Sequence, residues 1–128
     1  MAELRSFLGA LGGAERHLEF NMGDIIFNAG EPGGEMYVVT SGTVAMRARG
    51  ELLETVDTGG IFGEMALVDQ EPRSATAVAV TACELVPIDE KRFQELLRRE
   101  PGFGLQVMRV MAERLRRRTR GVQPARLG

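Results

Sequence analysis

Short runs of β-forming residues alternate with glycine-containing turns from Leu18 to Asp89, and this alternation limits the folds open to the chain. Regularly spaced short strands separated by turn residues are typical of an antiparallel sandwich or barrel. The runs are Ile25–Phe27, Met36–Val39, Thr43–Met46, Leu52–Val56, Thr76–Val80 and Glu84–Ile88. We therefore expect a mainly β protein.

Helical patterns flank this β region on both sides. Residues 2–11 carry apolar side chains at the i, i+3, i+4, i+7 spacing of one helix face. Asp89 is a good N-cap for a helix that Pro101-Gly102 should end, and a last helix is expected from about residue 103 to 119. One side of it carries the apolar residues Leu105, Met108, Met111, Ala112 and Leu115. The 128 residues are expected to form one domain over 1–128, with a core at about 5–119 and a tail at 120–128.

Composition excludes several classes of protein. The net charge of −2 argues against a general nucleic-acid binder, although the chain from Arg109 onward has seven arginines and one acid. A solvated helix face and a loose tail explain that basic end best, and the alternatives are contact with nucleic acid, a membrane or an acidic partner. Cys83 is the single cysteine, so the chain can form no internal disulfide. His17 is the single histidine, and neither residue belongs to a metal-binding pattern. Apolar runs are too short to span a membrane, no secretory signal is present, and we expect a cytoplasmic protein.

The stretch from Phe62 to Thr76 carries the chemistry. Gly63 precedes the start of a short helix, whose free N–H groups and positive dipole end attract anions. Arg73 adds a fork of donors suited to phosphate. Glu64 would repel a phosphate but would accept a hydrogen bond from a hydroxyl. A ligand with both a phosphate and a free ribose hydroxyl is a nucleotide, and a 3′,5′-cyclic phosphate leaves the 2′-hydroxyl free beside a single charge.

Two motifs resemble the cyclic nucleotide-binding domain family, which includes the catabolite activator protein, protein kinase A regulatory subunits and bacterial cyclic nucleotide-gated channels. The first motif is residues 30–42, a strand-turn-strand signature. The second is residues 62–67 with 73–75, the phosphate-binding cassette. The resemblance covers about residues 5–119 and implies an antiparallel β jelly roll with an N-terminal and two C-terminal helices. Phe27 departs from the smaller residue usual in the family, and we expect this to affect packing only.

The resemblance also implies roles for residues of this chain. Backbone N–H groups near Glu64 and at Ala75 would face the phosphate, Arg73 would pair with one of its oxygens, and Glu64 would accept from the ribose 2′-hydroxyl. Ser74 would donate to the phosphate or face the base, and it favours cyclic AMP over cyclic GMP. The expected ligand-binding residues are Phe62, Gly63, Glu64, Met65, Ala66, Arg73, Ser74, Ala75 and Arg114.

Arg114 has two interpretations. Its spacing from Arg73 resembles that of an arginine that caps the base in channel relatives, and a guanidinium can stack on a purine. The simpler interpretation, a solvated arginine in a basic run, is the favoured one.

The leading hypothesis is a stand-alone cyclic nucleotide sensor in which binding repositions the last helix. It involves no catalysis, cofactor or metal, because no nucleophile has an adjacent base. No DNA-binding domain is expected, because few residues follow the last helix. The alternative is an interaction module with an unused pocket, whose unknown protein partner or second copy would pair with the seam Met108, Met111 and Leu115.

Overall fold

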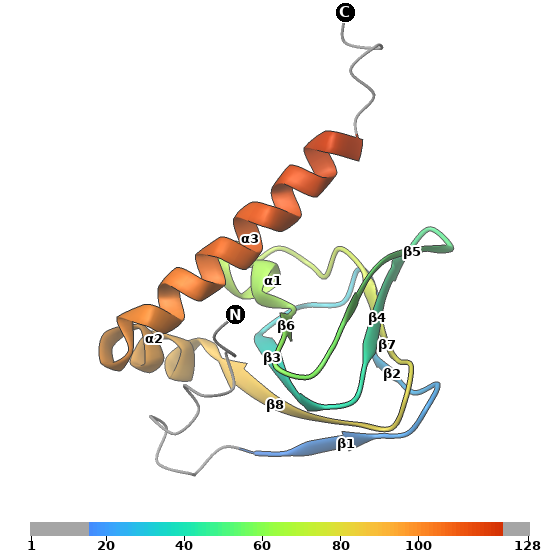
Figure 1. Ribbon diagram of the computed structural model, residues 1–128, viewed down its shortest axis with the longest axis horizontal. Helices are drawn as coiled ribbons and strands as arrows, with labels where there is room; N and C mark the ends of the chain where they lie inside the picture. Colours follow the sequence, from blue (N-terminus) through green and yellow to red (C-terminus); the bar gives the residue numbers. More distant parts are fainter. Residues whose placement is uncertain (1–15, 122–128) are drawn as a thin grey trace, which may run out of the picture.

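The computed structural model describes residues 16–121, with side chains as far as Arg117. The order of elements there is β1–β6, α1, β7, β8, α2 and α3 (Figure 1). The strands are β1 (Leu18–Phe20), β2 (Ile25–Phe27), β3 (Glu35–Ser41), β4 (Val44–Ala48), β5 (Glu51–Val56), β6 (Ile61–Phe62), β7 (Thr76–Ala79) and β8 (Cys83–Asp89). The helices are α1 (Glu64–Asp69), α2 (Glu90–Arg99) and α3 (Pro101–Gly121).

The strands form two four-stranded sheets in which every pair is antiparallel. One sheet has the order β1-β8-β3-β6 and the other β2-β7-β4-β5. The predicted antiparallel jelly roll with flanking helices is therefore confirmed. Each of the six predicted runs corresponds to a strand, although Thr43 and Val80 at the ends of two runs lie just outside β4 and β7. Strands β1 and β6 were not predicted. The helix predicted over residues 2–11 lies outside the described residues.

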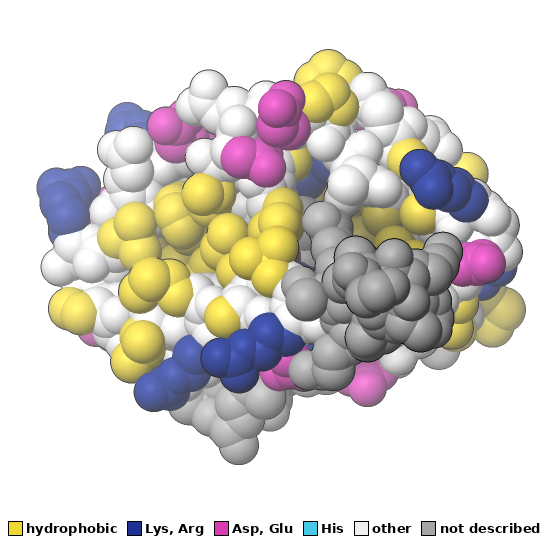
Figure 2. All heavy atoms as spheres, turned by 90° about the horizontal axis from the view of Figure 1, so that it is seen from above, with side chains coloured by type: hydrophobic (Ala, Val, Ile, Leu, Met, Phe, Trp, Pro, Cys, Tyr) yellow, Lys and Arg dark blue, Asp and Glu magenta, His cyan; other side chains and the backbone are white. Residues whose placement is uncertain are grey.

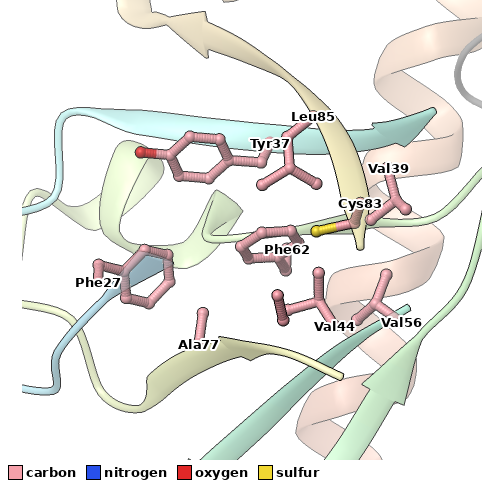
Figure 3. Close-up of a cluster of buried hydrophobic side chains, with 10 residues drawn as sticks. Phe27, Tyr37, Val39, Val44, Val56, Phe62, Ala77, Cys83 and Leu85 are labelled. Atoms are coloured by element: carbon pink, nitrogen blue, oxygen red, sulfur yellow. The ribbon is translucent and has the colours of Figure 1, made fainter. Parts of the chain in front are cut away.

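The roll is filled by side chains from both sheets (Figure 3). Three aromatic rings meet in it, with centroid separations of 6.0 Å for Phe27–Tyr37, 5.9 Å for Phe27–Phe62 and 5.2 Å for Tyr37–Phe62. Val39 and Leu85 pack in the same cluster. These rings come from β2, β3 and β6, so they tie the two sheets together at one end of the roll.

A second apolar cluster lies between the sheet that contains β3 and the helices. Met36 and Val38 of β3 pack there with Leu96 of α2 and Phe103 of α3. Successive side chains of a strand point to opposite faces. Residues of β3 therefore alternate between the helix layer and the roll interior, where Val39 packs. This is why the run Met36–Val39 is continuously apolar.

The two C-terminal helices begin where local chemistry allows. Asp89 caps α2 by accepting a hydrogen bond from the backbone N–H of Arg92 at 2.8 Å, as predicted. Helix α3 begins at Pro101, two residues earlier than predicted, because proline suits the first helical position. None of the described helices is long and apolar enough to cross a membrane.

Helix α3 is apolar on two sides. Phe103 and Val107 are buried against the sheet. Leu105, Met108 and Leu115, which lie on the side singled out from the sequence, are exposed. Met111, which was predicted to form a seam with Met108 and Leu115, instead packs against the core cluster, so that seam is not continuous. Figure 2, in which the molecule is seen from above relative to Figure 1, shows a patch of hydrophobic side chains with basic side chains along part of its edge. The sequence pattern alone did not show which apolar side faces the core.

Candidate functional site

A cavity of about 270 Å³ lies between α1, the end of α3 and the roll. All nine predicted site residues line it, from Phe62, Gly63, Glu64, Met65 and Ala66 through Arg73, Ser74 and Ala75 to Arg114. The structure therefore brings together residues that are up to 52 positions apart in the chain (114 minus 62). That they contact a ligand stays a prediction.

Gly63 sets the geometry of one wall. It is the N-cap of α1 with φ of 80°, a left-handed conformation that favours glycine. A Cβ atom at this position would lie 2.7 Å from Nη1 of Arg73. Glycine is therefore required twice, for the backbone turn and for the close approach of the guanidinium.

Arg73 is the buried cation of the site, with 6% of its surface exposed. Its Nη1 donates to the backbone oxygen of Gly63 at 3.0 Å and its Nη2 to that of Glu35 at 2.7 Å. The buried Nε has no hydrogen-bond partner among the described residues. A buried donor without a partner is unfavourable by about 1–3 kcal/mol, so an acceptor at this position would be stabilised. Burial lowers the pKa of Arg73, and neighbouring Tyr37 and acidic residues offset part of that effect.

The first sequence motif, residues 30–42, holds Arg73 through backbone hydrogen bonds and close packing. The backbone N–H of Arg73 donates to the oxygen of Glu31, and its own oxygen accepts from the N–H of Gly30, each at 2.8 Å. A Cβ atom at Gly33 would lie 2.5 Å from Cβ of Ala66 and 2.9 Å from Nε of Arg73. The two motifs are therefore one structural unit.

Phe27 does more than was predicted. The guanidinium carbon of Arg73 lies 4.0 Å from the centroid of its ring, within cation–π range. The expectation that Phe27 affects packing only is wrong, because a large ring on β2 provides the surface on which Arg73 rests. Phe27 also lines the cavity.

Glu64 is the buried acid of the site, with 1% of its surface exposed. Its Oε1 accepts a hydrogen bond from Nη1 of Arg114 at 2.6 Å. A carboxylate has about four acceptor sites, so this bond leaves capacity for a hydroxyl. An isolated buried carboxylate would be strongly unfavourable, and the pair with Arg114 explains why it is tolerated.

Arg114 is not a solvated arginine, so the favoured interpretation from the sequence is wrong. Its side chain is 14% exposed. Besides Glu64, it donates to Glu54 from Nε at 2.9 Å and to the backbone oxygen of Ile61 from Nη2 at 2.7 Å. Burial lowers its pKa, but Glu64 and Glu54 outweigh that effect, and the net pKa is raised. Arg114 thus links α3 to α1, β5 and β6.

Five lining residues were not predicted as part of the site, namely Phe27, Met46, Leu53, Glu54 and Arg117. Met46 and Glu54 are cross-strand partners in the β4–β5 hairpin. The turn at Arg49-Gly50 pairs Ala48 with Glu51 and Arg47 with Leu52, but a register shift between Met46 and Arg47 then brings Glu54 opposite Met46. Hairpin geometry alone would therefore not have indicated this pairing. No sequence signal pointed to Arg117, which lies on the helix face next to Arg114.

Within residues 16–121 no three histidine, cysteine, aspartate or glutamate side chains are grouped so that they could hold a metal ion. The cavity therefore offers a cation, a carboxylate, apolar walls and backbone groups. This set suits an anionic ligand that also carries hydroxyl groups.

Known proteins that resemble this chain include proteins named for cyclic AMP, an anionic ligand that carries a hydroxyl group. The CRP-like cAMP-activated global transcriptional regulator of Mycobacterium tuberculosis is 32% identical over 117 residues, which is 88% of this chain and 52% of that protein. The cyclic AMP receptor protein of Thermus thermophilus is 35% identical over 102 residues, or 76% of this chain and 47% of that protein. The crystal structure of the Thermus thermophilus catabolite activator protein superposes with a TM-score of 0.78 at 30% identity, covering 93% of this chain and 56% of that one.

This chain spans about half the length of these curated relatives. Residues 17–100, which hold the roll, α1 and α2, match the sequence pattern described as the cyclic nucleotide-binding domain. Together with the 30% or greater identity over most of the chain, that match shows that this protein belongs to the cyclic nucleotide-binding domain family.

Proposed function

We propose that this chain is a cyclic nucleotide sensor, a regulatory module that binds its ligand without transforming it. The observation that carries the proposal is the Nε of Arg73, a buried cationic donor without a partner among the described residues. The Arg73 residue lines the same cavity as Glu64. A cyclic phosphate would supply the missing acceptor, and a ribose 2′-hydroxyl would supply a donor for Glu64.

Cyclic AMP is the favoured ligand. Both curated relatives carry cyclic AMP in their names, and Ser74, which favours adenine by resemblance, lines the cavity. Cyclic GMP is the second candidate.

Movement of α3 is the proposed output. Arg114 of α3 bonds Glu64, which is the residue proposed to receive the ribose hydroxyl. A ligand that contacts Glu64 changes the surroundings of Arg114, and with them the free energy of each α3 position. The direction of that movement follows from whether the ligand strengthens or weakens the Arg114–Glu64 bond.

Thermal unfolding with cyclic AMP, cyclic GMP and 5′-AMP tests the proposal. At a ligand concentration of 100 times Kd, the folded state gains about 2.7 kcal/mol. We expect a clear rise in Tm with cyclic AMP, a smaller or equal rise with cyclic GMP at the same concentration, and almost none with 5′-AMP. Unchanged Tm with both cyclic nucleotides would contradict the proposal.

A ligand-independent interaction module is the second candidate. The exposed apolar side chains Leu105, Met108 and Leu115 on α3 favour it, since exposed apolar groups on one helix face suit a protein partner. A cavity that binds no nucleotide, together with self-association through α3, would favour this function over the first.

A further inference from the structure

Glu54 is a carboxylate in the cavity wall that the sequence did not single out. It lies on β5, opposite Met46 of β4, and its side chain is 20% exposed. Its Oε1 accepts from Nε of Arg114 at 2.9 Å and its Oε2 from Nη2 at 3.3 Å. Nη1 of Arg117 also lies 3.5 Å from Oε1. Glu54 thus receives two hydrogen bonds from one edge of the Arg114 guanidinium.

This two-point contact fixes the plane of the guanidinium. A bidentate arginine–carboxylate pair restricts orientation as well as distance. With Nε and Nη2 held by Glu54, the remaining nitrogen Nη1 reaches Oε1 of Glu64 at 2.6 Å. Without Glu54, only Glu64 and the backbone oxygen of Ile61 would hold the end of a long, flexible side chain.

We propose that Glu54 is a positioning residue for sugar recognition. It holds Arg114 so that Arg114 in turn orients the Glu64 carboxylate toward the 2′-hydroxyl of a bound cyclic nucleotide. This role rests on the proposed function, since it concerns how that same cavity discriminates a ribose from a 2′-deoxyribose. Glu54 acts through Arg114 and does not itself touch the ligand.

A simple charge effect makes a different prediction. Glu54 and Glu64 carry two negative charges and Arg114 and Arg117 two positive ones, so their formal sum is zero. Glu54→Gln would leave this group with one positive charge. If Glu54 acted only through its charge, every cyclic monophosphate would bind more tightly to the variant by a similar factor. The ratio of affinities for two ligands of equal charge separates this effect from positioning.

Isothermal titration with cyclic AMP and 2′-deoxy cyclic AMP measures that ratio. We expect the wild-type protein to bind cyclic AMP about tenfold or more tightly than the deoxy compound, as one hydrogen bond to a charged group predicts. Glu54→Gln should reduce the ratio to about threefold or less, and Arg114→Ala should do the same. In the Glu54→Gln/Arg114→Ala double variant the ratio should fall no further. Glu51→Gln, an equal charge change at the exposed start of β5, should leave the ratio at the wild-type value.

Two results would overturn the role of Glu54. One is an unchanged ratio in Glu54→Gln, and the other is a further loss when Glu54→Gln is added to Arg114→Ala, which would place Glu54 in direct contact with the ligand. Failure of the wild-type protein to bind either compound would instead contradict the proposed function. NMR of the ligand-free protein then still tests the positioning, since the Arg114 Nε–H should exchange slowly in wild type and fast in Glu54→Gln. Equal exchange in both would overturn it.

Discussion

At the scale of single residues, the site depends on how Arg73 is held. Its two terminal nitrogens bond backbone oxygens, and its guanidinium lies over the Phe27 ring. The side chain is therefore in place before any ligand arrives, and little conformational entropy is lost when a phosphate binds.

Arg73→Gln should weaken binding of cyclic AMP by roughly 30- to 3,000-fold, because removing one partner of a buried charged pair costs about 2–5 kcal/mol. Calorimetric titration measures the change. Arg47→Gln is the control, since Arg47 is an exposed arginine of β4 and should change Kd by less than about threefold. Similar losses in both variants would mean that Arg73 contributes only general charge.

Gly33→Ala should both destabilise the protein and weaken binding, because the new Cβ would overlap Ala66 and lie 2.9 Å from Nε of Arg73. Overpacking of this kind costs about 1–3 kcal/mol. Gly34→Ala is the matched control, since a Cβ there meets nothing within 4 Å. Urea unfolding and titration of both variants check this. Equal stability of the two would show that the backbone around Gly33 can move away freely.

At the scale of elements, the strongly patterned segments were predictable and the shortest ones were not. The six runs of β-forming residues are strands, and Asp89 caps α2 as expected. Strands β1 and β6 have three and two residues, too few for a period-2 pattern to emerge. They exist because they pair with β8 and β3, partners that lie far away in the sequence. Strand β2 is as short as β1, but its three residues are all apolar β formers, which made it visible in the sequence.

In the site, too, contacts within a local motif were predictable and contacts between distant segments were not. Gly63, Glu64 and Arg73 lie within one local motif, so their proximity could be predicted. The partners of Arg114 could not, because Glu54 and Glu64 are 60 and 50 positions away in the chain. Which of them an arginine on a helix reaches depends on how that helix packs, and α3 has apolar residues on two sides.

Removal of the α2 cap tests how the helix layer is stabilised. Asp89→Ala should lower the free energy of unfolding by about 1 kcal/mol, because the Arg92 N–H loses its acceptor. Asp89→Asn keeps a capping oxygen and should change stability much less. Chemical denaturation measures both. Equal effects of the two substitutions would mean that charge, and not the cap, stabilises α2.

At the scale of the whole molecule, the exposed side of α3 carries three large apolar side chains and, among the described residues, is a surface suited to a second copy. Met108 is 60% exposed there, between Leu105 and Leu115. A homodimer through this helix stays a prediction, and it would cover apolar side chains that now contact solvent.

Sedimentation at increasing protein concentration tests the homodimer. We expect a monomer–dimer equilibrium that Met108→Lys shifts toward the monomer, because a charge would be buried in the interface. Met22→Lys is the control, since Met22 is 73% exposed in the turn between β1 and β2, on a different part of the molecule. A wild-type protein that remains monomeric at all concentrations would contradict the prediction.

The alternation along β3 determines how a disturbance would spread through the molecule. Val38 and Val39 are consecutive, yet the first packs with the helices and the second fills the roll. The peptide bond between them is the border between the half that would hold a small molecule and the half that would report its presence. A change in side-chain size at Val38 would alter packing against the helices, whereas the same change at Val39 would alter packing inside the roll. Mutations in one strand can therefore adjust ligand binding and helix movement separately.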